Sequence, residues 1–132
     1  MEHHFTLSGT ALTVHLPAEL DHCSSQQLRQ EIDRLIRVRN IRSILFDFGN
    51  TEFMDSSGIG MLLTSYKSMR FMGGTILVIH AGERMRRILT LSGLDKFIDI
   101  YQGSVSYTHL VGPDSFHRKD STGGGEDFRT AL

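Results

Sequence analysis

Two adjacent serines, Ser56 and Ser57, follow Asp55 in the stretch FMDSSGIG, which covers residues 53–60. Hydroxyl groups in such a place can cap a helix, bind phosphate, act as nucleophiles or accept a phosphoryl group. The stretch lies between an apolar run and a segment with helical periodicity, which places the serines at the start of a helix. Unpaired N–H groups and the positive end of the helix dipole favour a capping carboxylate or an attached phosphate there.

Two of these uses fit the residues. Asp55, Ser56 or Ser57 could accept a hydrogen bond from the first helical turn, which is worth about 1 kcal/mol. A phosphoryl group on a serine would instead add a charge of about -1.5 to -2 beside Asp55, and so change a docking surface without changing the fold. The residues alone leave both interpretations open.

The other roles of the two serines, as a nucleophile or in phosphate binding, lack the sequence motifs that they require. A nucleophile elbow needs G-x-S-x-G, and the position of its first glycine is held here by Met54 or Asp55. A phosphate-binding P-loop needs a Gly-Lys pair, and the chain has none. The G-x-G of residues 58–60 is too short for a dinucleotide fingerprint and indicates close packing at the first helical turn.

The histidines and the single cysteine do not form a recognisable metal motif. No H-E-x-x-H and no cysteine pair occurs, so we expect neither a metal site nor a cofactor. Cys23 has no partner for an internal disulfide, which fits a reducing compartment. The seven histidines are scattered: His3, His4, His15, His22, His80, His109 and His117.

Composition excludes several functional classes. The 132 residues suffice for one domain with a core, and 39% of them are hydrophobic. A net charge of -1 and a pI near 6.6 provide no basic field for direct nucleic-acid binding. No apolar run is long enough for a membrane span, and the N-terminus lacks the pattern of a signal peptide, so we expect a cytoplasmic protein.

Strand and helix patterns alternate along the chain, which predicts an α/β fold with a mostly parallel sheet and an antiparallel hairpin at its start. A capping box at Ser24 and Gln27 is expected to begin the first helix, and Gly93 to end the third. Strands are predicted at 5–7, 11–16, 41–48, 75–79 and 97–101, and the later helices at 57–71 and 83–92. Residues 1–102 form the predicted domain, and residues 103–132, with Gly-Pro and Gly-Gly-Gly, a loosely ordered tail.

The ordered set of motifs resembles the STAS family, specifically bacterial anti-sigma factor antagonists. The resemblance covers about residues 5–101 and rests on PAELDHCS, IRSILFDF, FMDSSGIG, YKSM, GGTILVI and MRRILTLSGLDKFIDIY. FMDSSGIG before an amphipathic helix is its most specific part. The resemblance implies a STAS-type single domain, with a mixed sheet of four or five strands and helices packed on it.

It also implies a function. An antagonist of this kind binds an anti-sigma factor that is itself a serine kinase, is released when that kinase phosphorylates it, and is reset by a serine phosphatase. The phosphorylated residue would be Ser57, the second serine of D-S-S-G. Asp21 matches the acid of the neighbouring loop, and Asp55, Ser56 and Gly58 complete the partner-binding loop. In this interpretation the protein is not an enzyme.

Two alternatives are weighed beside it. The chain could be a STAS docking subunit of another assembly, such as a lipid-transport ATPase or a stress-sensing complex, without a phosphorylation switch. It could also be a small nucleotide hydrolase, which no base-plus-nucleophile pattern supports. Two places depart from the family: Ala18, where a glycine is common, and residues 103–132, which lack the pattern of a closing amphipathic helix.

Overall fold

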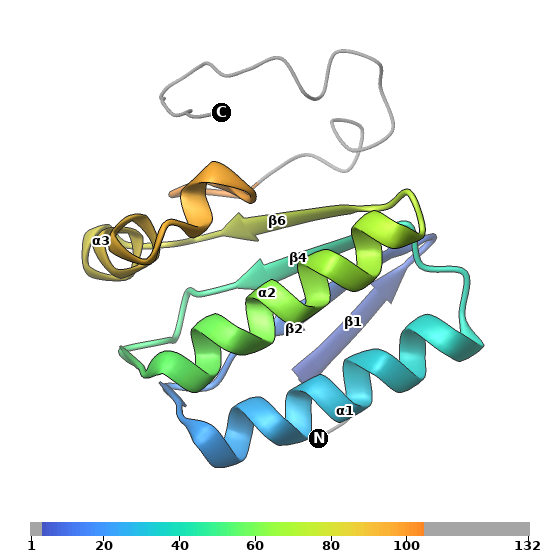
Figure 1. Ribbon diagram of the computed structural model, residues 1–132, viewed down its shortest axis with the longest axis horizontal. Coiled ribbons are helices and arrows are strands. Elements are labelled where there is room, and N and C mark those ends of the chain that lie inside the picture. Colours follow the sequence, from blue (N-terminus) through green and yellow to red (C-terminus); the bar gives the residue numbers. More distant parts are fainter. Residues whose placement is uncertain (1–3, 105–132) are drawn as a thin grey trace.

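The computed structural model describes residues 4–104, which form an α/β domain (Figure 1). Helices and short strands alternate along the chain, as the sequence predicts. In chain order the elements are β1 (Phe5–Ser8), β2 (Ala11–His15), β3 (Glu19–Leu20), α1 (His22–Val38), β4 (Ser43–Asp47), β5 (Phe53–Met54), α2 (Ser56–Phe71), β6 (Thr75–Ile79), α3 (Glu83–Ser92), the 3₁₀ helix η2 (Leu94–Lys96) and β7 (Asp99–Ile100).

The main sheet has five strands in the order β1-β2-β4-β6-β7. The hairpin of β1 and β2 is antiparallel, and each later neighbour runs parallel. Parallel neighbours need a crossover, which α1, α2 and α3 provide in turn. A second, two-stranded sheet pairs β3 with β5 in parallel. The mixed five-stranded sheet confirms the predicted fold class.

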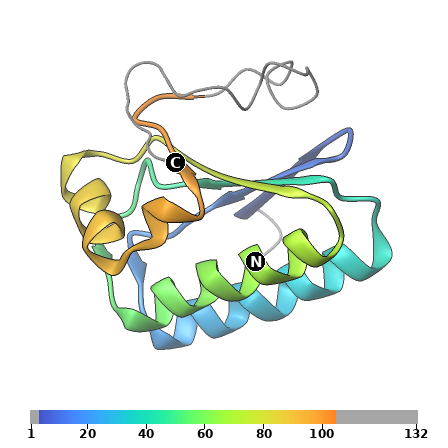
Figure 2. The same cartoon turned by 45° about the horizontal axis from the view of Figure 1, so that its top comes forward.

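Helices α1 and α2 lie side by side across one face of the main sheet (Figures 1 and 2). Alternate residues of β2, β4 and β6 point into this layer, as buried strands require. The two helices contribute their apolar stripes from the other side. The fully buried centre of this core includes Leu12, Val14, Leu20, Leu28, Ile32, Ile44, Phe46 and Leu62.

The opposite face of the sheet carries a smaller apolar cluster. It consists of Ala11, Leu45, Leu77 and Ile79, with Tyr101 packed against it. Strand β4 is therefore buried on both faces, as its continuous apolar run predicts.

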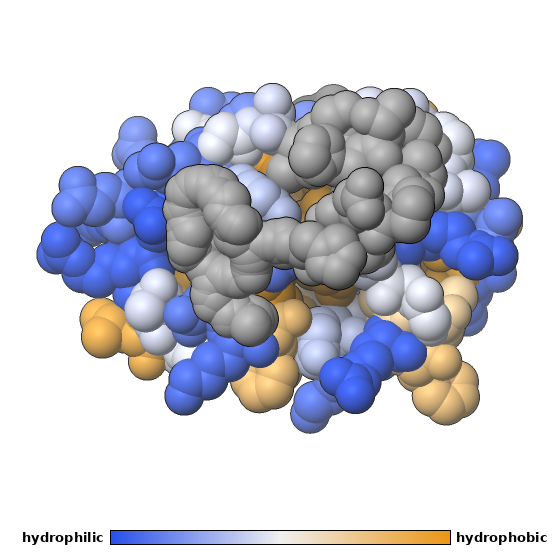
Figure 3. Space-filling model, turned by 90° about the horizontal axis from the view of Figure 1, so that it is seen from above, coloured by the Kyte–Doolittle hydropathy of each residue, from blue (hydrophilic) through white to orange (hydrophobic). Residues whose placement is uncertain are grey.

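On the surface seen in Figure 3, hydrophilic residues gather at both ends of the view, and the apolar residues along one rim are separated by hydrophilic ones.

Three sequence predictions about element ends are wrong. The strand predicted at 41–48 is limited to Ser43–Asp47. Helix α1 does not begin with a capping box of Ser24 and Gln27, because Asp21 is the N-cap and Ser24 is its reciprocal partner. The last strand is limited to Asp99–Ile100, since η2 precedes it and Phe97 still has helical backbone angles. The predicted C-cap is confirmed: Gly93 has φ of 88°, in the left-handed region that favours glycine.

The sequence patterns also missed the small sheet. Each of its strands has only two residues, too few to show a period.

The predicted tail lies outside the described residues, apart from its first two positions. Within residues 4–104, no helix is both long and apolar enough to cross a membrane.

Candidate functional site

The small sheet brings the starts of α1 and α2 together at one end of the domain. Leu20 of β3 pairs with Met54 of β5, and each strand is followed by one capping acid and then a helix. The N–H of Asp55 donates to the carbonyl of Leu20 at 3.2 Å, which ties the two turns directly. Thr51 fixes the approach to β5 by donating its hydroxyl to the carbonyl of Pro17 at 3.0 Å.

Asp21 and Asp55 hold equivalent places in the two turns. Both have extended backbone, with φ of -103° and -102°. The carboxylate of Asp21 accepts from the N–H of Ser24 at 3.0 Å, and the N–H of Asp21 donates to the Ser24 hydroxyl at 3.0 Å. The carboxylate of Asp55 accepts from the N–H of Ser57 at 2.8 Å. Both predicted acids are therefore helix caps whose charge faces first-turn amides.

The hydrogen bonds of the capping box change the acidity of Asp21. The N–H of Ser24, and secondly its hydroxyl, stabilise the ionised carboxylate and lower the pKa of Asp21 below its ordinary value of 3.8. Asp21 is therefore a charged group across the neutral range. A negative charge at this position also suits the positive end of α1.

Ser56 and Ser57 occupy the first two positions of α2 and differ in their surroundings. Ser56 is exposed, whereas Ser57 is half-buried between the two helix starts. The hydroxyl oxygen of Ser57 lies 3.4 Å from Nδ1 of His22, the first residue of α1. The fold therefore brings to Ser57 a histidine that sequence reasoning had left among the scattered ones.

Gly58 allows the two turns to approach each other. A Cβ added there would lie 2.6 Å from Cγ of Met54 and 2.9 Å from Cδ2 of Leu20. Both distances are well below ordinary carbon contact distances of about 3.5–4.0 Å. Gly60, two residues later, has no atom within 4 Å of the equivalent position. Close packing therefore requires a glycine at residue 58 and not at residue 60.

The surface beside the serines contains an apolar side chain that the sequence did not single out. Phe53 of β5 has 47% of its surface exposed, although it is part of a strand. Its neighbour Met54 is buried under Gly58. Exposed aromatic rings are enriched at protein-docking surfaces.

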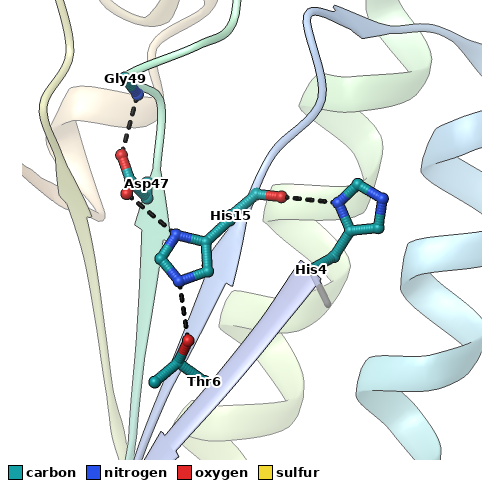
Figure 4. Close-up of polar contacts among 5 residues, drawn as sticks. All are labelled: His4, Thr6, His15, Asp47 and Gly49. Atoms are coloured by element: carbon teal, nitrogen blue, oxygen red, sulfur yellow. Dashed lines mark hydrogen bonds and ion pairs between the residues drawn. The ribbon is translucent and has the colours of Figure 1, made fainter. Parts of the chain in front are cut away.

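A second polar cluster lies on the main sheet (Figure 4). Nε2 of His15 is 2.9 Å from the hydroxyl of Thr6, and its Nδ1 is 3.1 Å from the carboxylate of Asp47. Asp47 also accepts from the N–H of Gly49 at 2.9 Å. The order hydroxyl, imidazole, carboxylate is that of a nucleophilic triad, but Thr6 is exposed on the edge strand β1. We interpret the chain of bonds as a link across β1, β2 and β4.

Other chemistry receives no support from the described residues. No three His, Cys, Asp or Glu side chains within residues 4–104 gather closely enough to hold a metal ion.

A shallow groove lies at the far end of α2 from Ser57. It is lined by Tyr66, Met69, Arg70, Gly74, Thr75, Ile76, Phe97 and Asp99.

A mixed five-stranded sheet with two helix starts paired at one end defines the chain as a single α/β domain of known type. Residues 5–106 match the STAS domain profile, so the chain belongs to the STAS domain family. The match spans the whole stretch over which the sequence motifs resemble this family, and it confirms that resemblance.

Curated relatives agree. The anti-sigma F factor antagonist of Paenibacillus polymyxa is 38% identical over 106 residues, which are 80% of this chain and 87% of the relative. The anti-sigma-B factor antagonist of Bacillus subtilis is 29% identical over 90 residues, or 67% of this chain and 80% of the relative.

Solved structures share the fold. Unphosphorylated SpoIIAA, an anti-sigma factor antagonist, superposes with a TM-score of 0.63 at 23% identity, covering 76% of this chain and 89% of that one. SpoIIAA in its phosphorylated form, from Bacillus, superposes with a TM-score of 0.62 at 24% identity. This superposition covers 81% of this chain and 96% of that one. A sulfate transporter family protein from Wolinella succinogenes superposes with a TM-score of 0.63 at 11% identity. This superposition covers 74% of this chain and 81% of that one.

Proposed function

We propose that this chain is an anti-sigma factor antagonist whose binding to an anti-sigma factor with serine kinase activity is ended by phosphorylation of Ser57. The observation that carries the proposal is the position of Ser57. Its hydroxyl lies at a junction of two helix starts, half-buried and framed by the capping acids Asp21 and Asp55. The 38% identity to an anti-sigma F factor antagonist supports the same role.

The surroundings of Ser57 explain how one phosphoryl group would end docking. The proposed docking surface consists of Asp21, Asp55, Ser56, Ser57 and Gly58, to which we add the exposed ring of Phe53. A partner fitted to this surface meets a small hydroxyl between two carboxylates. A phosphate adds volume and about -1.5 to -2 charge there, so like-charge repulsion and steric overlap both oppose the complex.

The fold need not change for this switch to operate. The N–H of Ser57 donates to the carboxylate of Asp55, and the N–H of Asp55 donates to the carbonyl of Leu20; the Ser57 hydroxyl takes no part in these bonds. SpoIIAA has the fold of this chain in both its unphosphorylated and its phosphorylated structure, with TM-scores of 0.63 and 0.62. We therefore attribute the effect of phosphorylation to the surface.

We further propose that the protein is not an enzyme, that it acts in the cytoplasm without binding nucleic acid directly, and that a serine phosphatase restores the unmodified state. Residues 1–102 are the proposed functional domain. The absence of Lys and Arg from residues 17–28 and 50–63 supports docking to a protein and not to a nucleic acid, because phosphate backbones are bound chiefly by those residues.

The experiment compares the wild-type chain, Ser57→Ala, Ser57→Asp and Ser56→Ala in binding to candidate anti-sigma kinases with ATP present. We expect Ser57→Ala to stay bound, Ser57→Asp to bind at least about tenfold more weakly, and Ser56→Ala to behave as the wild type. Wild-type affinity of Ser57→Asp, or release of Ser57→Ala by ATP, would contradict the proposal.

The alternative function is a STAS docking subunit of another assembly, such as a lipid-transport ATPase or a stress-sensing complex, which keeps its partner without a switch. The likeness of the fold to a sulfate transporter family protein is the observation that favours this alternative. A subunit of that kind would bind its partner equally well with or without ATP, and Ser57→Ala would change nothing.

A further inference from the structure

His22 lies at the point where a phosphate on Ser57 would be placed. Its Nδ1 is 3.4 Å from the Ser57 hydroxyl oxygen, although the two residues are far apart in the sequence. His22 is the first residue of α1 and Ser57 the second of α2, and the β3–β5 pair fixes these helix starts side by side. Phosphorylation would replace the hydroxyl hydrogen by a phosphorus atom with three oxygens, extending towards groups that now contact the hydroxyl.

Apart from His22, the charged side chains of the two segments that form the site are acidic. The two segments that form the site, residues 17–28 and 50–63, carry four carboxylates and no Lys or Arg, and His22 is their single histidine. The four are Glu19, Asp21, Glu52 and Asp55. Asp21 and Asp55 each already accept a hydrogen bond from one first-turn amide, those of Ser24 in α1 and Ser57 in α2. An incoming phosphate therefore has one side chain in these segments that can supply a positive charge.

We propose that His22 is the phosphate-contacting residue of the switch: its imidazolium pairs with the phosphate carried by Ser57. This inference deepens the proposed function and rests on it, since it assigns a partner within the chain to the modified serine. The unmodified hydroxyl makes only a long contact of 3.4 Å with the imidazole, whereas the phosphate would receive a charge-assisted hydrogen bond. His22 thereby offsets the repulsion between the phosphate and the two capping acids.

The pairing has a measurable signature in the phosphate itself. A phosphoserine has a second pKa of about 6, and a nearby cation favours the dianion and lowers that pKa, whereas carboxylates raise it. Replacing His22 by Gln keeps hydrogen bonding but removes the cation. The matched control is Cys23→Ser, which changes the next, also exposed, position of α1 and leaves the imidazole in place.

The experiment uses the full chain with phosphoserine placed at position 57 during translation, so that no kinase is required. The ³¹P resonance is titrated with pH in the wild-type, His22→Gln and Cys23→Ser chains. We expect the midpoint in His22→Gln to lie about 0.5–1 pH unit above that of the other two. Equal midpoints in all three chains, or a lower midpoint in His22→Gln, would overturn the proposal.

A second measurement needs no substitution. In the phosphorylated wild-type chain, the imidazole ¹H–¹³C resonances of His22 should shift with pH together with the ³¹P signal, and in the unphosphorylated chain they should titrate differently. Resonances of His22 that are identical in the two chains at every pH would overturn the contact. If no kinase modifies Ser57, the proposed switch fails, while both titrations still report on His22.

Discussion

Replacing Gly58 and Gly60 separately by alanine tests how the loop carrying Ser57 is held. Each substitution in a helix gains about 1 kcal/mol from backbone propensity. At residue 60 the new Cβ meets no atom within 4 Å, so Gly60→Ala should be stabilised by about that amount. At residue 58 the new Cβ would lie 2.6 Å from Met54 and 2.9 Å from Leu20, both of them buried.

The cost at residue 58 follows from those distances. Neighbouring atoms must move by roughly 1 Å to reach ordinary contact, and overpacking of a core costs typically about 1–3 kcal/mol. Taking the upper half of that range, Gly58→Ala should be destabilised by a net amount of about 1–2 kcal/mol. The two variants should then differ by about 2–3 kcal/mol.

Urea unfolding followed by circular dichroism measures this difference. With a denaturant dependence of about 2 kcal/mol/M, the midpoints of the two variants should be separated by about 1 M or more, with the wild type between them. A midpoint for Gly58→Ala equal to or above that of Gly60→Ala would refute the close packing of α2 on β3 and β5.

Three further outcomes are expected. Asp55→Ala should lose about 1 kcal/mol of unfolding free energy, because the N–H of Ser57 loses its cap, whereas Asp55→Asn should lose little; equal losses in urea unfolding would point to charge and not to capping. Because the pKa of Asp21 is lowered by folding, its contribution to stability is present above pH 3.8 and is lost as the pH falls through the lower folded value. Urea midpoints measured with falling pH should drop more in the wild type than in Asp21→Asn, and parallel curves would contradict this. A chain ended after Gln102 should unfold cooperatively and bind its partner, and loss of either property would show that later residues belong to the domain.

Long periodic segments were predictable from the sequence. The apolar runs of β4 and β6 and the stripes of α1, α2 and α3 define the fold class, because the same residues provide both the period and the core. Gly93 was predictable as a cap, since a glycine directly after an apolar helical stripe commonly adopts the left-handed conformation that ends a helix. These features depend on residues that are neighbours in sequence.

The features that were not predictable depend on neighbours in space. Both Asp21 and Ser24 are residue types that can cap the start of α1. Their spacing in the sequence does not show which one is the N-cap, whereas the backbone geometry identifies Asp21. His22 was indistinguishable from other histidines until the β3–β5 pair brought it to Ser57. The bonds of His15 to Thr6 and Asp47 likewise arise from strand register alone.

The site itself was only partly predictable. The four residues 55–58 are contiguous and were found as one motif, and the structure places them at the start of α2 as expected. Asp21 was added through family resemblance, and its position beside them follows from the pairing of Leu20 with Met54. The exposed ring of Phe53 gave no sequence signal, because an apolar residue before a helix is more often buried.

The most direct test of the central claim is peptide mass spectrometry of the full chain after incubation with ATP and each candidate anti-sigma kinase, beside Ser57→Ala and Ser56→Ala. We predict a single phosphoryl group on Ser57 in the wild type and in Ser56→Ala, and none in Ser57→Ala, with one of the kinases. Phosphorylation of Ser57→Ala, or of none of the chains by any kinase that binds them, would contradict the proposed switch.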